Sequence, residues 1–180
     1  MLTETRLWRQ LIFRLGEELS RLEPAETVWL KANLAKVADG QRQLHAFFLQ
    51  AGGAQLCHNC AGNCCDCGKN HLTLVNLLGY LLVGEAAPEP DFSRICPFLG
   101  DGGCRHDVGR RPFNCVTFLC AEVEERLDPS NRVSFYHHER QLRHLYAEFD
   151  RRYAGSGLCG IFIRGESLAG RPFLEAPKKV

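Results

Sequence analysis

The sequence predicts a mainly α-helical protein: a single helical domain over residues 1–180 that contains irregular, cysteine-rich loops. The chain has 180 residues, about the size of one ordinary domain, and 45% of them are apolar, which is enough to build a core. Apolar residues recur three and four positions apart near the start of the chain and again over residues 134–153. The ten cysteines gather mainly between these two stripes. We therefore expect helices that flank an irregular region.

Two helices are expected in the N-terminal region, which covers residues 1–52. The leucine stripe predicts an amphipathic helix that ends near Pro24, and its members are Leu7, Leu11, Leu15, Leu19 and Leu22. A second helix is expected over residues 25–50. Asp39-Gly40 is a point where it could be interrupted, and Gly52-Gly53 predicts its end.

The remaining elements divide the chain into a cysteine-cluster region over residues 57–120 and a C-terminal helix and tail over 128–180. Residues 72–83 form the longest apolar run, for which we favour a buried helix, and residues 84–92 are expected to be a loop. The stripe over 134–153 predicts the clearest helix of the chain. A short strand is expected at 159–164.

Eight of the cysteines form two sets that predict metal ligation. The first set reads C-x2-C-x3-C-C, and the second follows at wider intervals. The eight are Cys57, Cys60, Cys64, Cys65, Cys96, Cys104, Cys115 and Cys120. A C-x2-C turn lets two thiolates converge on one ion. Neighbouring side chains on an extended backbone point in opposite directions, so the pair Cys64-Cys65 favours two metals, or two sides of one cluster. The spacing leaves zinc, iron and an iron–sulfur cluster open, with redox-active thiols or packed cysteines as alternatives.

The two cysteine stretches also carry a resemblance. "CHNCAGNCC" followed by "CPFLGDGGCRHDVGRRPFNCVTFLC" combines the C-x2-C-x3-C-C loop with Cys-Pro, Gly-Cys and Arg-Pro elements and a closing pair of cysteines. This combination resembles the YkgJ-type, or CxxCxxCC, cysteine-cluster family, described as a zinc- or iron-chelating domain. The resemblance covers residues 57–120 and implies that all eight cysteines are metal ligands. Some relatives with this signature are flagellin lysine N-methylases, which implies a metal- or cluster-dependent enzyme acting on protein as an alternative.

Several residues near the cysteines are candidates for supporting roles. Cys67 is a possible additional ligand, whereas Cys159 is expected to be packed among apolar neighbours. Arg111 is expected to donate to metal-bound sulfurs, and Pro112 to fix a turn that returns Cys115 toward the site. The same donor role is weaker for Arg94, Arg105 and Arg110. His58 and His106 are expected at the surface, with metal ligation as the alternative.

Charge and missing motifs exclude several function classes. A formal net charge of +1 gives no strong field for nucleic acid or an anionic membrane, so neither is expected as a partner. The N-terminus lacks the apolar run of a signal peptide, and the longest apolar run is too short to span a bilayer, so we expect a cytoplasmic protein. Dinucleotide, P-loop, zincin and serine-hydrolase motifs are absent, and whether the chain is an enzyme stays open. A third hypothesis is a protein-interaction module that docks an unidentified protein partner through the helix over 134–153.

Overall fold

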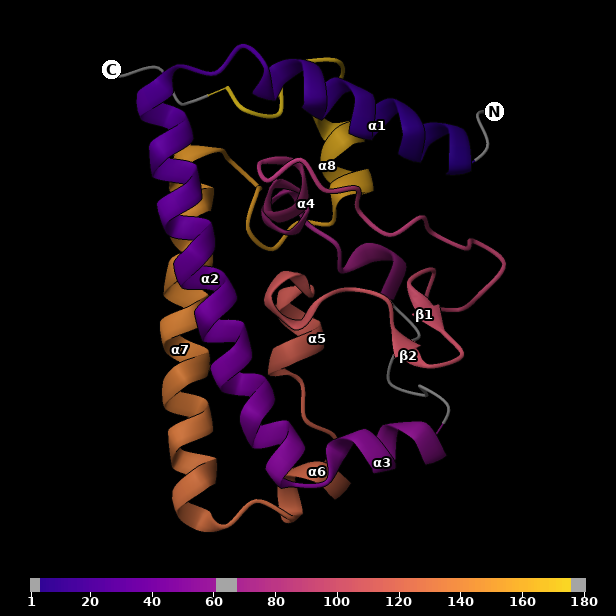
Figure 1. Cartoon of the computed structure of the whole chain (residues 1–180), viewed down its shortest axis with the longest axis vertical. Coiled ribbons are helices and arrows are strands. Elements are labelled where there is room, and N and C mark those ends of the chain that lie inside the picture. The colour runs from indigo at the N-terminus through magenta and orange to yellow at the C-terminus, as the bar shows by residue number, and fades with distance from the viewer. Residues whose placement is uncertain (1–3, 61–67, 176–180) are drawn as a thin grey trace.

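The computed structural model describes residues 4–60 and 68–175, and it confirms the mainly α-helical class. Two long helices, α2 (Pro24–Gln50) and α7 (Pro129–Arg152), run side by side along one flank of the molecule (Figure 1). They are antiparallel: Arg152 at the end of α7 binds Glu26 at the start of α2, and Asn131 at the start of α7 donates to Gln50. This pair is the scaffold against which the other elements pack.

Helix α2 is continuous, so the expected interruption at Asp39-Gly40 is wrong. A Cβ added at Gly40 would lie 3.3 Å from Leu142 Cδ1, which shows that α7 approaches closely at this position. The glycine therefore serves helix packing rather than a break. Pro24 is the first residue of α2, where its missing N–H costs nothing. The helix ends at Gln50, as Gly52-Gly53 predicts, and Gly52 takes a left-handed conformation with φ 70°.

Helix α7 begins earlier than its apolar stripe suggests because Asp128 caps it. The Asp128 carboxylate accepts hydrogen bonds from the backbone N–H groups of Ser130 and Asn131, at 2.9 and 3.0 Å. Its apolar stripe faces the core, where four side chains are buried: Phe135, Leu142, Tyr146 and Phe149. The stripe of α7 is thus committed to packing within the chain, and it gives no support to a docking face on this helix.

The other helices predicted from apolar periodicity are also present. Helix α1 (Glu4–Leu19) crosses one end of the scaffold, and α4 (Leu74–Leu81) lies inside the molecule (Figure 1). Trp8 of α1 packs on Phe98 and Phe162, with ring centroids 5.8 and 6.2 Å apart. Helix α4 is buried almost throughout, as its continuous apolar run predicts.

The strand expected at residues 159–164 is wrong, because helix α8 (Ile161–Leu168) occupies this segment. The Ile161 N–H donates to Leu72 O at 2.7 Å, but the chain then turns, and Arg164 N–H donates to Gly160 O at 2.9 Å in helical spacing. Arg164 is buried and donates to the carbonyls of Ala154 and Phe173. Among the described residues, this segment meets no partner strand along which a ladder could continue.

The cysteine region, taken with the residues that flank it, contains more regular structure in its described part than the loops that we expected. It contains the short helices α3 (Gly53–Asn59), α5 (Phe113–Thr117) and α6 (Ala121–Glu125), and the 3₁₀ turns η2 (Gly68–Asn70) and η3 (Val108–Arg110). A hairpin joins β1 (Leu99–Gly100) to β2 (Gly103–Cys104). The hairpin, α3 and α5 lie on the same side of the α2–α7 pair, and α6 lies at its lower end (Figure 1). Over residues 4–60 and 68–175, no helix has both the length and the apolar character needed to cross a membrane.

Candidate metal centre

The hairpin brings Cys96 and Cys104 together. Leu99 pairs with Cys104 across the hairpin, and Arg105 N–H donates to Phe98 O at 2.9 Å. Burial raises the pKa of the Cys96 thiol, the nearby backbone N–H groups of Phe98 and Leu99 lower it in part, and the Cys104 sulfur raises it further. Two neighbouring sulfurs, one of them facing backbone N–H groups, fit a thiophilic metal ion, because such amides stabilise a bound thiolate.

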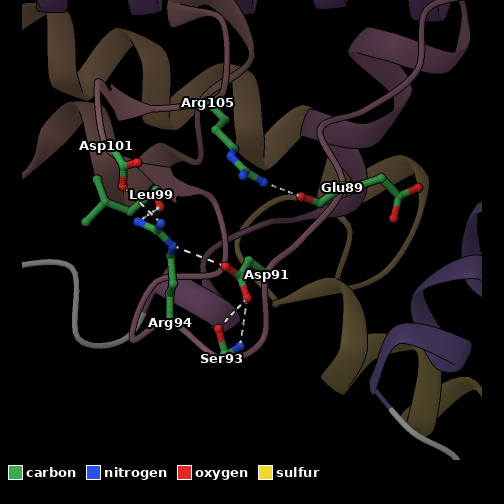
Figure 2. A network of polar contacts seen from close by, with 7 residues as sticks. All are labelled: Glu89, Asp91, Ser93, Arg94, Leu99, Asp101 and Arg105. Atoms are coloured by element: carbon green, nitrogen blue, oxygen red, sulfur yellow. Dashed lines mark hydrogen bonds and ion pairs between the residues drawn. The ribbon is translucent and has the colours of Figure 1, made fainter.

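The Arg94 side chain contacts both the hairpin and the loop that precedes it (Figure 2). Its guanidinium donates to the carboxylates of Asp91 and Asp101, at 3.2 and 2.9 Å, and to Leu99 O at 3.2 Å. Asp91 also accepts from the Ser93 hydroxyl at 2.6 Å. One arginine therefore ties the loop before Cys96 to the turn of the hairpin.

Three of the arginines, those for which donation to sulfur was the weaker expectation, donate to oxygen atoms among the described residues. Besides Arg94, Arg105 donates to Glu89 O at 2.8 Å (Figure 2). Arg110 pairs with Glu85 and lies 4.5 Å above the Tyr80 ring. Carbonyl and carboxylate oxygens lie within reach of each guanidinium and are the stronger acceptors.

Gly68 joins the end of the first cysteine stretch to the start of the second. It is buried, and a Cβ added to it would lie 2.4 Å from Cys96 Sγ and 2.8 Å from Cys96 Cβ. Only a glycine allows the backbone to approach the cysteine this closely. The approach places two segments that are far apart in sequence against each other beside the Cys96 sulfur.

His71 lies beside Cys115, a proximity that the sequence analysis missed. The two side chains approach to 3.5 Å between His71 Nδ1 and Cys115 Sγ. Burial lowers the pKa of His71, which favours its neutral form. The backbone N–H of His71 donates to Gly68 O at 3.2 Å, so the turn that contacts Cys96 also fixes the His71 backbone. The only sequence signal was its position four residues after Cys67.

Cys57, Cys60 and Cys120 lie in or at the ends of two short helices that pack together. Cys57 lies in α3, and Cys60 follows its end, with its N–H donating to Leu56 O at 3.0 Å. Cys120 directly precedes α6. Leu56 and Cys120 pack against the same small apolar cluster of Ala51, Val123 and Leu127. These contacts place the first cysteine pair near the last cysteine of the second set.

The described cysteine sulfurs do not form a complete metal coordination shell. Over residues 4–60 and 68–175, no three side chains of Cys, His, Asp or Glu lie close enough to hold a metal ion between them. Cys64 and Cys65, expected as ligands, and Cys67, the possible additional ligand, lie outside the described residues. Cys159 lies beside Gly155, half-buried, and its thiol donates to Gly160 O at 3.7 Å.

A buried polar network holds the backbone just before Cys115. Gln41 Nε2 and Asn76 Nδ2 both donate to Arg111 O, at 2.5 and 2.8 Å, and both donate to the Tyr146 hydroxyl, at 2.9 and 3.1 Å. The three side chains come from α2, α4 and α7. Burial raises the pKa of Tyr146, so its hydroxyl stays neutral. The helical scaffold thus fixes one carbonyl of the cysteine region.

Arg111 and Pro112 connect this network to α5. Pro112 is buried and directly precedes the helix, and its carbonyl accepts from Cys115 N–H at 2.9 Å. Arg111 Nε donates to His106 O at 3.4 Å, and its charge contributes to lowering the pKa of both His45 and His106. Arg111 therefore places a positive charge within the cysteine region.

His106 is buried, and the expectation that it lies at the surface is wrong. Its side chain packs against Phe98, with ring centroids 4.5 Å apart, and its Nδ1 lies 3.2 Å from the Tyr80 hydroxyl. Burial, and secondarily the charge of Arg111, lowers the pKa of His106 to about 4, so it is neutral at pH 7. His58, by contrast, is exposed as expected.

Comparison of the chain with protein-family models, with curated proteins and with solved structures finds no match in any of the three. The resemblance of the cysteine pattern to the YkgJ-type family therefore stays a prediction, and the case for function depends on the residues themselves.

Proposed function

We propose that this chain is a metal-binding protein that coordinates zinc, or iron in mononuclear or iron–sulfur form, through its cysteines. The observation that carries the proposal is the hairpin, whose pairing of Leu99 with Cys104 and of Arg105 with Phe98 brings Cys104 close to Cys96. Burial by itself favours the protonated Cys96 thiol, whereas a bound metal cation and the nearby backbone N–H groups would favour the thiolate.

Further contacts extend the pair toward the other cysteines. Gly68 lies against Cys96, and His71 of the same turn lies against Cys115. Helix α3, which carries Cys57, packs with the helix that follows Cys120. The proposed ligands are the eight cysteines of the two sets: Cys57, Cys60, Cys64, Cys65, Cys96, Cys104, Cys115 and Cys120. Arg111 would supply compensating positive charge.

A bound metal would link elements that are too short to be stable alone. Helices α3, α5 and α6 have seven residues or fewer, and the strands have two each. Helices and hairpins of this size are not stable by themselves in water. Because a metal ion binds the folded arrangement of ligands and not the unfolded chain, its binding free energy would stabilise this region.

Metal analysis of the protein purified without oxygen tests the proposal. We expect elemental analysis to find zinc or iron in a fixed ratio to protein. A visible absorption spectrum then separates the two, because Zn²⁺ is colourless and an iron–sulfur cluster is not. Folded protein that contains neither metal, and takes up neither when supplied with it, would overturn the proposal.

Single serine substitutions test the ligand assignment. Cys60→Ser and Cys115→Ser should lower the metal content and destabilise the fold, because each removes a thiolate ligand. Cys159→Ser is the matched control and should retain the metal, since Cys159 lies outside both cysteine sets. Metal content that is unchanged in Cys60→Ser would contradict the assignment.

A further inference from the structure

We infer that His71 is a metal ligand together with Cys115, so that one metal position of the centre takes a mixed nitrogen and sulfur donor set. This inference rests on the proposed metal-binding function, and it adds a ligand that does not belong to either cysteine set. Its basis is the approach of His71 Nδ1 to Cys115 Sγ.

The spacing of the two donor atoms matches that of two ligands on one ion. A tetrahedral zinc ion holds sulfur at about 2.3 Å and imidazole nitrogen at about 2.0–2.1 Å, which places the two donor atoms about 3.5 Å apart. The observed Nδ1–Sγ separation is 3.5 Å. The two side chains can therefore bind the same metal ion without a change in the distance between their donor atoms.

Backbone contacts on both sides fix the segment that carries His71. Before it, Gly68 lies against Cys96. After it, Leu72 O accepts from Ile161 N–H at 2.7 Å. A Cβ added at Gly160 would lie 2.4 Å from Asn70 O, so α8 begins in direct contact with this segment. A half-buried imidazole held in this way needs little reorganisation to bind a metal.

The backbone around Cys115 is fixed by contacts of its own, separate from those that fix His71. The Cys115 N–H donates to Pro112 O, and the preceding carbonyl, Arg111 O, accepts from Gln41 and Asn76 of the scaffold. Cys115 is also exposed, so a metal ion can reach this pair from solvent. The two donors thus come from separately supported segments and meet at an accessible point.

Reconstitution with Co²⁺ tests the inference, because the colour of cobalt reports the donor atoms bound to it. We would titrate wild-type protein, His71→Ala, His71→Cys and the control His58→Ala with Co²⁺ alone, without oxygen, and record visible spectra. Loss of an outer hydrogen-bond partner weakens metal binding by roughly 10- to 100-fold. We expect His71→Ala to weaken binding at one cobalt position by more than about 100-fold, as loss of a direct ligand should.

His71→Cys keeps the conclusion testable if the alanine variant folds poorly, which circular dichroism would reveal. Thiolate replaces imidazole as a ligand, so this variant should keep the full cobalt content, and its ligand-field bands should move to longer wavelength. Two results would overturn ligation by His71: a loss of cobalt affinity below about 100-fold in His71→Ala, or absorption bands at unchanged wavelength in His71→Cys. Either result would assign His71 a hydrogen bond to the Cys115 sulfur instead. His58→Ala should match the wild type. A wild-type protein that binds no cobalt, zinc or iron would instead overturn the proposed function.

Discussion

Gly68→Ala is the sharpest test of how the two cysteine stretches meet. The added Cβ would lie 2.4 Å from Cys96 Sγ, 2.8 Å from its Cβ and 3.3 Å from its Cα. Ordinary contact between such atoms begins near about 3.5 Å, so the sulfur and its Cβ must move by roughly 1 Å. Rotation of the Cys96 side chain cannot relieve this overlap, because its Cβ is fixed to the backbone. Gly68 is a helical-turn residue without a positive φ, so steric overlap is the only expected cost.

Overpacking of this kind costs about 1–3 kcal/mol. If the whole cost reduces the free energy of metal binding, affinity for metal drops by about 5- to 150-fold. We would measure zinc affinity by competition with a chelator, and the urea midpoint with and without metal. Gly102→Ala is the matched control: the added Cβ meets no atom within 4 Å, and the residue lies in the turn of the hairpin, two residues before Cys104. Wild-type affinity and an unchanged midpoint in Gly68→Ala would refute the close approach of Gly68 to Cys96.

Two further predictions concern the scaffold. Asn76→Ala removes the bonds from Asn76 to Arg111 O and the Tyr146 hydroxyl, together with the bonds that its Oδ1 accepts from Thr73 at the start of α4. It should lower the free energy of unfolding by about 2–3 kcal/mol in urea denaturation, and a loss below about 0.5 kcal/mol would contradict this. Hydrogen bonds from Arg152, partly offset by burial, lower the pKa of Glu26 from its ordinary value of 4.5. The stability that this carboxylate contributes is therefore fully present above pH 4.5, and it is lost as the pH falls through the lowered pKa of the folded protein. Glu26→Gln should therefore be less stable than wild type at about pH 7, with a smaller difference at about pH 3, and an equal difference at both would contradict the ion pair.

The helices could be predicted from sequence because their signal is local. Leucines of the first stripe, such as Leu11 and Leu15, are buried on one face of α1. The stripe of α7 behaves in the same way, and its side chains face α2. Burial of one face every 3.6 residues depends only on the helix geometry, so the pattern can be seen without knowledge of the partner element.

The failures share a physical cause, since each depends on a contact distant in sequence. Asp39-Gly40 has the composition of a turn, but Gly40 accommodates Leu142, about a hundred residues later. The segment at 159–164 is rich in β-branched and aromatic residues, yet its one strand-like bond, to Leu72, does not extend. His106 was expected at the surface because eight cysteines would already fill two tetrahedral metal sites, but it packs against both Phe98 and Tyr80.

The candidate centre was predictable as a set of residues but not as an arrangement. Cysteine spacing predicts which sulfurs could bind metal, because thiolate ligands must be cysteine and their clustering is visible in sequence. His71 carried no such signal, since its proximity to Cys115 follows from contacts of Gly68 and Ile161 on either side of it. Such contacts are properties of the folded chain.

The buried polar side chains of the scaffold explain how the helical core can serve the cysteine region. Burying an amide costs free energy unless its donors are satisfied, and an apolar residue of similar size would pack at Gln41 or Asn76 without that cost. Both amides instead donate to Arg111 O, a carbonyl outside the helices and strands. That carbonyl lies four residues before Cys115, so the network holds the approach to α5 in one position. The core thus gives up some apolar packing to set the backbone of a cysteine that a metal would require in place.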